Sequence, residues 1–167
     1  MTIDDAGVRA YVGLGGNVGD ARARLRGAFD ALARIPSTCL RRRSRLYRTP
    51  PWGVADQPAF INAVAELETC LGPRELLDAM LSIEHAYGRR RGAERWGPRT
   101  LDLDLLAYDD IQCEEAGLTL PHPRIGERAF VLVPLAEIAA DLRISGAGTV
   151  RELLARVDTD GCEPIDD

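Results

Sequence analysis

Asp102 and Asp104 give this sequence its clearest chemistry. They stand two positions apart in LDLDLLAY (101–108), which alternates as a strand does. A strand points residues i and i+2 to one face, so both carboxylates share a face with Cα atoms roughly 6.5 Å apart. Aspartates spaced in this way often only face solvent, but like charges placed side by side repel each other. Mg²⁺, which takes one or two carboxylates together with substrate phosphates, would hold the pair.

Arginines crowd the segment that leads into this strand. They are Arg89, Arg90, Arg91, Arg95 and Arg99. A charge run is usually a solvated surface, but glycines and a proline in this segment resist helix formation. Guanidinium groups offer forked donors to phosphate oxygens. Arginines next to a magnesium site indicate a nucleoside triphosphate.

The scarce aromatic residues stand where they could stack on a heterocycle, although each alone is more typical of core or surface. Aromatic residues are 5% of the chain, and those in question are Trp52, Phe60, Trp96 and Phe130. Asn62, two residues after Phe60, could hydrogen-bond to the edge of such a ring. We interpret the set as a candidate slot for a flat heterocycle.

Two shorter motifs allow more than one interpretation. His122 lies between two prolines, so it could bind phosphate, exchange a proton, or only hydrogen-bond within its own loop. The segment GLGGNV (13–18) follows a short apolar run, fails the dinucleotide-binding pattern and lacks a phosphate-loop lysine. We interpret it as a tight turn between a strand and a helix.

Composition excludes several classes of protein. The 167 residues carry 21 basic and 26 acidic side chains, a net charge of −5, and every basic residue is arginine. The absence of lysine excludes mechanisms that need one, such as Schiff bases. The acidic balance argues against a surface that grips nucleic acid or an anionic membrane. The four cysteines form no CxxC pair, and no apolar run is long enough for a membrane span. We expect a cytoplasmic protein.

The elements that must position these residues follow from periodicity and from turn residues. The sequence predicts strands over 9–14, 39–47, 59–67 and 101–108, and helices over 21–35 and 73–87. Asp20 is placed to cap the start of the first helix. This βαββαβ order predicts an α+β, ferredoxin-like core. Extra C-terminal strands and helices follow it: a short strand from Ile111, an apolar stretch over 130–138 that could be a short helix broken by Pro134, and a helix over 150–157. Thr149 and Glu152 have the spacing of a capping box at the start of that last helix. We expect one domain over 1–157 and a flexible acidic tail over 158–167.

Several motifs together resemble the 6-hydroxymethyl-7,8-dihydropterin pyrophosphokinase family. They are GLGGN (13–17), YRTPPWG (47–53), QPAFIN (57–62), RWGPRTLDLDLL (95–106), PHPR (121–124) and RAFVLVPLAEIA (128–139). The segment RWGPRTLDLD is the most specific, whereas DxD or PHPR alone means little. The resemblance implies a ferredoxin-like fold and transfer of pyrophosphate from ATP to the pterin hydroxymethyl group, releasing AMP, in folate biosynthesis.

The same resemblance implies a role for individual residues. Asp102 and Asp104 would bind two magnesium ions, while Arg89 and Arg99 would stabilise charge on the transferred group and on AMP. The implied ATP-binding residues are Glu84, Arg91, Trp96, Arg99, Leu105, Thr119, His122 and Arg128. The implied pterin-binding residues are Thr49, Pro50, Trp52, Gly53, Phe60, Asn62, Trp96 and Phe130. Which of Arg89, Arg90 and Arg91 meets phosphate stays open.

Two other functions fit parts of the sequence. A non-catalytic RNA-binding module can have the same βαββαβ order, but it should show aromatic residues on its central strands and a basic face. A magnesium-dependent nucleotide hydrolase could use the same aspartate pair. We expect a monomer that binds small molecules and neither nucleic acid nor membranes.

Overall fold

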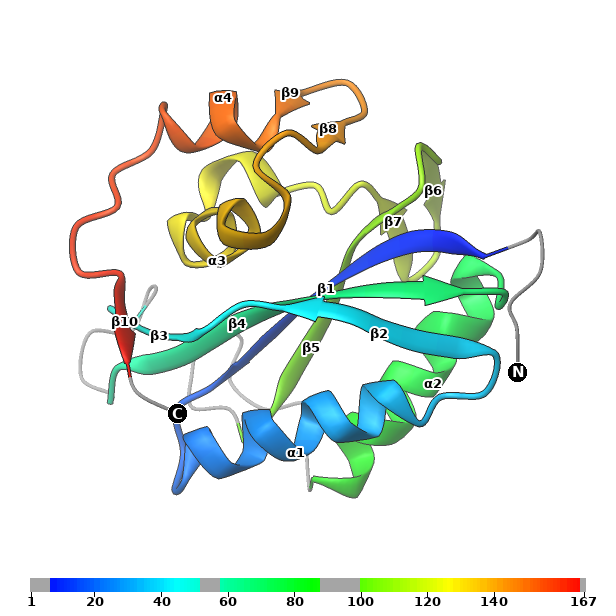
Figure 1. Cartoon of the computed structure of the whole chain (residues 1–167), viewed down its shortest axis with the longest axis horizontal. Coiled ribbons are helices and arrows are strands. Elements are labelled where there is room, and N and C mark those ends of the chain that lie inside the picture. Colours follow the sequence, from blue (N-terminus) through cyan, green and yellow to red (C-terminus); the bar gives the residue numbers. More distant parts are fainter. Residues whose placement is uncertain (1–6, 52–57, 88–99, 166–167) are drawn as a thin grey trace.

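A single antiparallel sheet organises the fold, and the computed structural model describes residues 7–51, 58–87 and 100–165. The strands run in the order β10-β3-β4-β1-β5, and β2 also pairs with β4. They are β1 (Val8–Gly16), β2 (Thr38–Arg43), β3 (Leu46–Thr49), β4 (Phe60–Thr69), β5 (Asp102–Tyr108) and β10 (Glu163–Ile165). Helices α1 (Ala21–Ala33) and α2 (Pro73–Ala86) lie on one side of the sheet, and α3 (Ala129–Ala139) and α4 (Val150–Leu154) lie on the other (Figure 1).

The predicted ferredoxin-like order is confirmed, with one strand divided in two. The sequence predicted a continuous strand over 39–47, whereas the structure has β2 and β3, both paired with β4. Ser44 lies between them: its amide donates to the Val64 carbonyl at 2.9 Å, and its hydroxyl accepts from the Val64 amide at 2.9 Å. The side chain thus replaces a backbone partner where the strand is interrupted.

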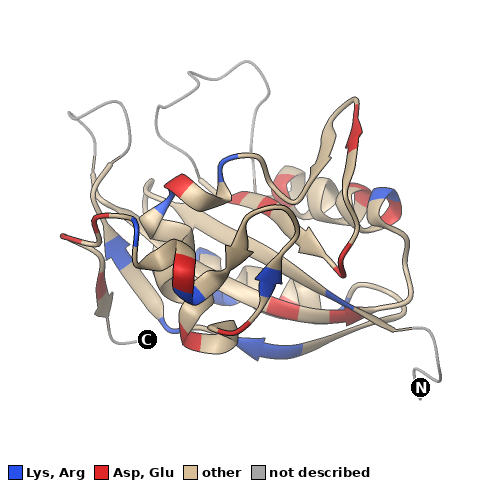
Figure 2. Cartoon of the chain, turned by 90° about the horizontal axis from the view of Figure 1, so that it is seen from above, with Lys and Arg blue, Asp and Glu red and all other residues tan. Residues whose placement is uncertain are grey.

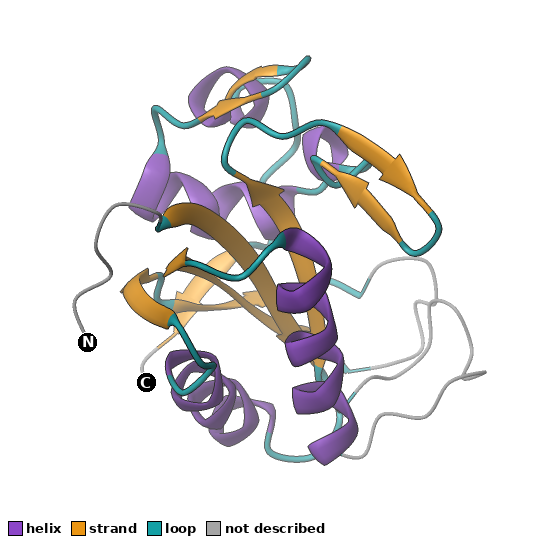
Figure 3. Ribbon diagram, turned by 90° about the vertical axis from the view of Figure 1, so that its right-hand side faces the viewer, coloured by secondary structure: helices purple, strands orange, loops and turns teal. Residues whose placement is uncertain are grey.

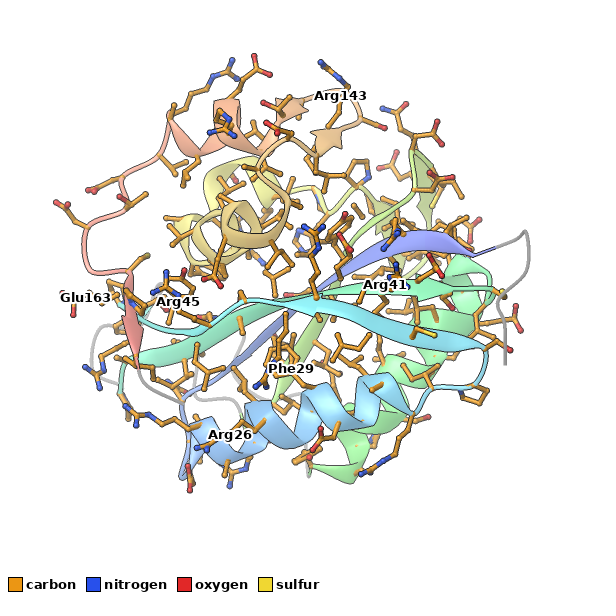
Figure 4. All side chains as sticks on the ribbon, in the orientation of Figure 1. Arg26, Phe29, Arg41, Arg45, Arg143 and Glu163 are labelled. Atoms are coloured by element: carbon orange, nitrogen blue, oxygen red, sulfur yellow. The ribbon has the colours of Figure 1, made fainter. Side chains whose placement is uncertain are left out.

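The first core lies between the sheet and helices α1 and α2. Asp20 caps α1 by accepting from the Ala23 amide at 3.1 Å, as its position before the apolar periodicity predicted. Phe29 reaches from α1 toward the sheet and is 1% exposed (Figure 4). Leucines of β5 enter the same core. Burial of a side chain such as Phe29 contributes roughly 2–3 kcal/mol.

The second core lies between the opposite face of the sheet and α3, so the sheet has helices on both sides (Figure 3). We expected Pro134 to break the apolar stretch, but α3 continues through it. Proline has no backbone N–H, so one hydrogen bond of the helix is lost. The helix nevertheless persists because Val131, Leu132, Leu135 and Ile138 are all buried against the sheet and its neighbours.

Three expectations for the C-terminal region need correction. The strand expected from Ile111 begins at Cys113: β6 (Cys113–Glu115) pairs with β7 (Leu118–Leu120). Helix α4 is shorter than predicted, although Thr149 and Glu152 form its predicted capping box. The tail expected to be flexible carries β10, which pairs with β3 and extends the sheet. The small elements η1 (Ile125–Glu127), β8 (Arg143–Ile144) and β9 (Gly148–Thr149) complete the chain.

The distribution of charged residues and the length of the helices bear on whether the chain could bind a charged partner or cross a membrane. Seen from above, the basic and acidic residues of the described chain are interspersed rather than gathered by sign (Figure 2). Among the described helices, none combines the length and the apolar character that crossing a membrane requires.

Candidate active site

Two glycines of β1 separate the candidate site residues of its two neighbouring strands. Gly15 pairs with Asn62 of β4 and with Asp102 of β5, and Gly13 pairs with Asp104. Directly opposed residues of antiparallel strands share a face, so Asn62 and both aspartates lie on the side covered by α3. Neighbouring strands are about 4.8 Å apart. A strip of bare backbone about two strand spacings wide therefore separates the asparagine from the carboxylates.

The aspartates of β5 are partly exposed, as the alternation of the strand predicted. Leu103 and Leu105 point to the opposite core and are each 5% exposed. The carboxylate of Asp104 lies 3.8 Å from the guanidinium of Arg128. Within the described residues, no group of three or more histidine, cysteine, aspartate or glutamate side chains could hold a metal ion. The pair is thus a sparse anchor, which suits Mg²⁺ that keeps water and phosphate ligands better than a metal that needs a full protein cage.

Arg128, at the start of α3, brings positive charge to these carboxylates. Its Nη1 faces Asp104, and its guanidinium carbon lies 5.6 Å from the centre of the Phe130 ring. Burial lowers the pKa of Arg128, although a guanidinium stays protonated at neutral pH. Its Nε is buried and has no hydrogen-bond partner among the described residues. A buried donor of this kind is costly, and a ligand oxygen would satisfy it.

His122 is fixed in its loop as a neutral side chain. Its amide donates to the Leu106 carbonyl of β5 at 2.8 Å, and its Nδ1 accepts from the Arg124 amide at 3.2 Å. Nδ1 therefore carries no proton, and Nε2–H is the donor of the neutral ring. Burial and the nearby charge of Arg128 lower the pKa of His122 to about 4. Of the interpretations considered, the hydrogen bond within its own loop is confirmed, and proton exchange near neutral pH is disfavoured.

Thr49 orients the side chain of Asn62. The Thr49 hydroxyl donates to the Asn62 Oδ1 at 2.9 Å, and both residues are buried. This bond directs the amide nitrogen of Asn62 toward β1, where a Cβ built on Gly15 would lie 2.8 Å from it. Phe60, two residues before Asn62, shares its face and is partly exposed, as is Phe130. The side chains of the candidate slot thus come from three elements: Thr49 from β3, Phe60 and Asn62 from β4, and Phe130 from α3.

Two residues implied as ATP contacts have buried side chains. Glu84 on α2 is 3% exposed, and its carboxylate accepts from the Leu103 amide at 2.7 Å. The Leu105 side chain belongs to the core under α1 and α2, so only its backbone could meet a nucleotide. Thr119 on β7 is partly buried, which is compatible with a contact.

A family model described as 7,8-dihydro-6-hydroxymethylpterin-pyrophosphokinase (HPPK) matches residues 11–140. The chain belongs to the HPPK family. The match begins in β1 and ends just after α3, so it includes every element that carries the described site.

Curated HPPK relatives match over nearly the whole chain. The 2-amino-4-hydroxy-6-hydroxymethyldihydropteridine pyrophosphokinase of Methylorubrum extorquens is 53% identical over 95% of this chain and 99% of its own. The protein of the same name from Pseudomonas aeruginosa is 46% identical over 94% of this chain and 96% of its own.

Solved structures show the same fold at low sequence identity. Wild-type Plasmodium falciparum HPPK-DHPS crystallised with pteroate is 13% identical and aligns with a TM-score of 0.71 over 90% of this chain. The wild-type protein with STZ-DHP is 14% identical and aligns with a TM-score of 0.67 over 93% of this chain. This chain spans 42% of the length of each of those proteins.

Several HPPK-like site residues lie outside the described parts of the chain. These are Trp52, Gly53, Arg89, Arg91, Trp96 and Arg99. Their implied roles stay predictions. Pro50 is described, and it is exposed directly after β3.

The two glycines of β1 are the part of the site that sequence reasoning missed. We expected a tight turn there, but Gly13, Gly15 and Gly16 lie within the strand. The signal was their spacing, because Gly13 and Gly15 alternate with the same period as Asp102 and Asp104. Glycine in a strand often marks close approach of a neighbouring group.

Proposed function

We propose that this HPPK-family chain transfers pyrophosphate from ATP to the hydroxymethyl group of 6-hydroxymethyl-7,8-dihydropterin and releases AMP, a step of folate biosynthesis. The pyrophosphokinase name of relatives at 46% and 53% identity supports this reaction. The observation that carries it is the placement of an aspartate pair and Arg128 on one sheet face, across bare glycine backbone from Asn62.

Asp102 and Asp104 are the proposed ligands of Mg²⁺, and we propose two ions. Their partial exposure and shared face support this role. When bound, the metal supplies charge neutralisation for the triphosphate. Arg128 then lies beside the same carboxylates, where its guanidinium can donate to a phosphate oxygen.

The reaction needs positioning more than a strong protein base. The hydroxymethyl oxygen attacks the β-phosphorus, and the bond from that phosphorus to the α–β bridging oxygen breaks. AMP leaves with the bridging oxygen, and the hydroxyl proton is released. Neutral His122 suits hydrogen bonding rather than proton transfer in this step. The proposed phosphate-binding set also includes Arg89, Arg91 and Arg99.

Asn62 and the strand that precedes it support a pterin site. The fixed amide of Asn62 can hydrogen-bond to the edge of the ring, and backbone from Thr49 to Gly53 can read the same edge. Phe60 and Phe130 are proposed to lie against the ring faces, and Trp52 and Trp96 to close over the ligands. We also propose that the chain works as a cytoplasmic monomer on small molecules.

The two alternatives are less well supported. An RNA-binding module would need a basic sheet face with stacking residues, but β1 presents glycines there and its neighbour β5 presents two aspartates. A hydrolase with the same metal ligands would have no use for the orienting bond between Thr49 and Asn62.

The assay that tests this proposal combines purified protein, Mg²⁺, ATP and hydroxymethyl-dihydropterin and measures adenine nucleotides by chromatography. We expect AMP to form only when the pterin is present. Formation of ADP and inorganic phosphate without pterin would support the hydrolase instead. No turnover together with retention of RNA would support the binding module.

A further inference from the structure

Glu84 is a buried carboxylate at a place where a helix normally presents apolar side chains. It lies one helical turn after Met80 and two turns after Leu76, and all three residues are at most 3% exposed. A buried carboxylate is costly unless it is paired and hydrogen-bonded. Apolar packing of α2 alone would be served better by leucine or methionine, so the carboxylate must act through its partner.

One partner of Glu84 is the peptide between the two proposed metal ligands. Glu84 Oε2 accepts from the Leu103 amide at 2.7 Å, and Leu103 stands between Asp102 and Asp104. In the described part of the sheet, β5 is an end strand whose strand neighbour is β1. Alternate N–H groups of an end strand point away from the sheet and need acceptors outside it. Glu84 supplies one for this amide.

The bond constrains the backbone between the two aspartates. A peptide unit is planar, so an acceptor that fixes the Leu103 N–H also fixes the orientation of the peptide carbonyl of Asp102. A bond to an ionised acceptor is shorter and stronger than one between neutral groups. The Leu103 side chain is held in the opposite core at 5% exposure. The strand segment is thereby held from its core side and from its edge.

We propose that Glu84 is a positioning residue, which holds β5 so that Asp102 and Asp104 present their carboxylates to the metal–triphosphate complex. This inference rests on the proposed function. It assigns Glu84 a role through the backbone instead of the direct ATP contact that the family resemblance implied. The expected effect follows from the behaviour of groups that support metal ligands, whose loss typically weakens metal binding by roughly 10–100-fold.

The test compares Glu84→Met, which keeps volume but removes the acceptor, with Glu84→Gln, which keeps an acceptor oxygen but not the charge. Asp78→Asn controls for loss of a carboxylate, because Asp78 is exposed on the same helix. Leu76→Val controls for weakened packing, because Leu76 is fully buried on the same face. The readouts are Mn²⁺ binding by electron paramagnetic resonance with a nonhydrolysable ATP analogue, the Mg²⁺ concentration for half-maximal turnover, and KM for the pterin.

We expect Glu84→Met to weaken Mn²⁺ binding and raise the half-maximal Mg²⁺ concentration by about tenfold or more, with KM for the pterin changed less than about twofold. Glu84→Gln should fall between Glu84→Met and wild type, and both controls should match wild type. Metal binding by Glu84→Met within about twofold of Leu76→Val would overturn the proposal. If Glu84→Met does not fold, wild-type metal binding by folded Glu84→Gln overturns it. A wild-type chain that makes no AMP refutes the proposed function, while the Mn²⁺ comparison still decides the role of Glu84.

Discussion

The guanidinium of Arg128 lies 3.8 Å from the carboxylate of Asp104, and the Arg128 side chain is 13% exposed. The residue that precedes α3 and a residue of β5 thus meet on the sheet face that also carries Asn62. The pairing places one positive charge beside the proposed metal ligands before any substrate arrives. A triphosphate bound there would gain both the metal and an oriented arginine.

Asp104→Asn should lower kcat by about a thousandfold or more, because an amide is a much poorer ligand for Mg²⁺ than a carboxylate. The ion pair with Arg128 is partly exposed, so the free energy of unfolding should change by about 1 kcal/mol or less. Asp110→Asn, an exposed substitution in the turn after β5, is the matched control and should keep wild-type activity. Steady-state kinetics and urea unfolding measure both quantities. Substantial activity in Asp104→Asn would remove this residue from the metal site.

Thr49→Val should weaken recognition of the pterin while sparing the nucleotide. The substitution removes the hydroxyl that orients Asn62, at a cost of about 1 kcal/mol in stability. We expect KM for the pterin to rise by about tenfold and KM for ATP to change less than about twofold. Thr38→Val is the control, because it removes a buried hydroxyl that contacts Thr69 at 2.7 Å at the far end of β4. Equal effects of the two variants on KM would contradict a specific role for Thr49.

Gly15→Ala and Gly13→Ala should differ clearly in their effect on KM for the pterin. A Cβ on Gly15 would lie 2.8 Å from the Asn62 amide nitrogen, a distance that forces the side chain to move. A Cβ on Gly13 would lie 3.4 Å from a methyl group of Leu106, which can adjust. We expect Gly15→Ala to raise KM for the pterin by about tenfold or more and Gly13→Ala to raise it much less. An equal KM for the pterin in the two variants would contradict a specific role for the glycine backbone beside Asn62.

Acidification should destabilise the protein through His122. Burial, and then Arg128, lowers the pKa of this imidazole in the folded chain to about 4, from an ordinary value near 6.5. Between these values the unfolded chain binds the proton and the folded chain does not, so stability falls as pH decreases. The loss should reach up to about 3 kcal/mol near pH 4 and vanish above about pH 6.5. Urea unfolding of wild type and His122→Asn at several pH values measures it, and an identical pH dependence in the two proteins would contradict it.

Local patterns were enough to predict β5 and α1. Alternation of leucine and aspartate identified β5 because one face meets a core and the other does not. Asp20 and the apolar spacing after it identified α1. The division of β2 from β3 at Ser44 was not predictable, because it depends on a hydroxyl that reaches the backbone of β4.

The site itself required tertiary information. The partnership of Thr49 with Asn62 depends on the register of two strands, which no local pattern fixes. Glycine signals a turn in isolation, so the strand role of Gly13 and Gly15 appears only when Asn62 and Asp102 lie on either side. The family resemblance singled out Glu84 as an ATP contact, but its bond to the Leu103 amide appears only in the structure.

The most direct test of pyrophosphate transfer follows the β-phosphorus. ATP labelled with ³²P at the β position is incubated with the protein, Mg²⁺ and hydroxymethyl-dihydropterin, and the products are separated by chromatography. Pyrophosphate transfer predicts that the label moves to the pterin in step with the formation of unlabelled AMP. Label that stays in ADP, or that appears only in inorganic phosphate or pyrophosphate, would contradict pyrophosphate transfer.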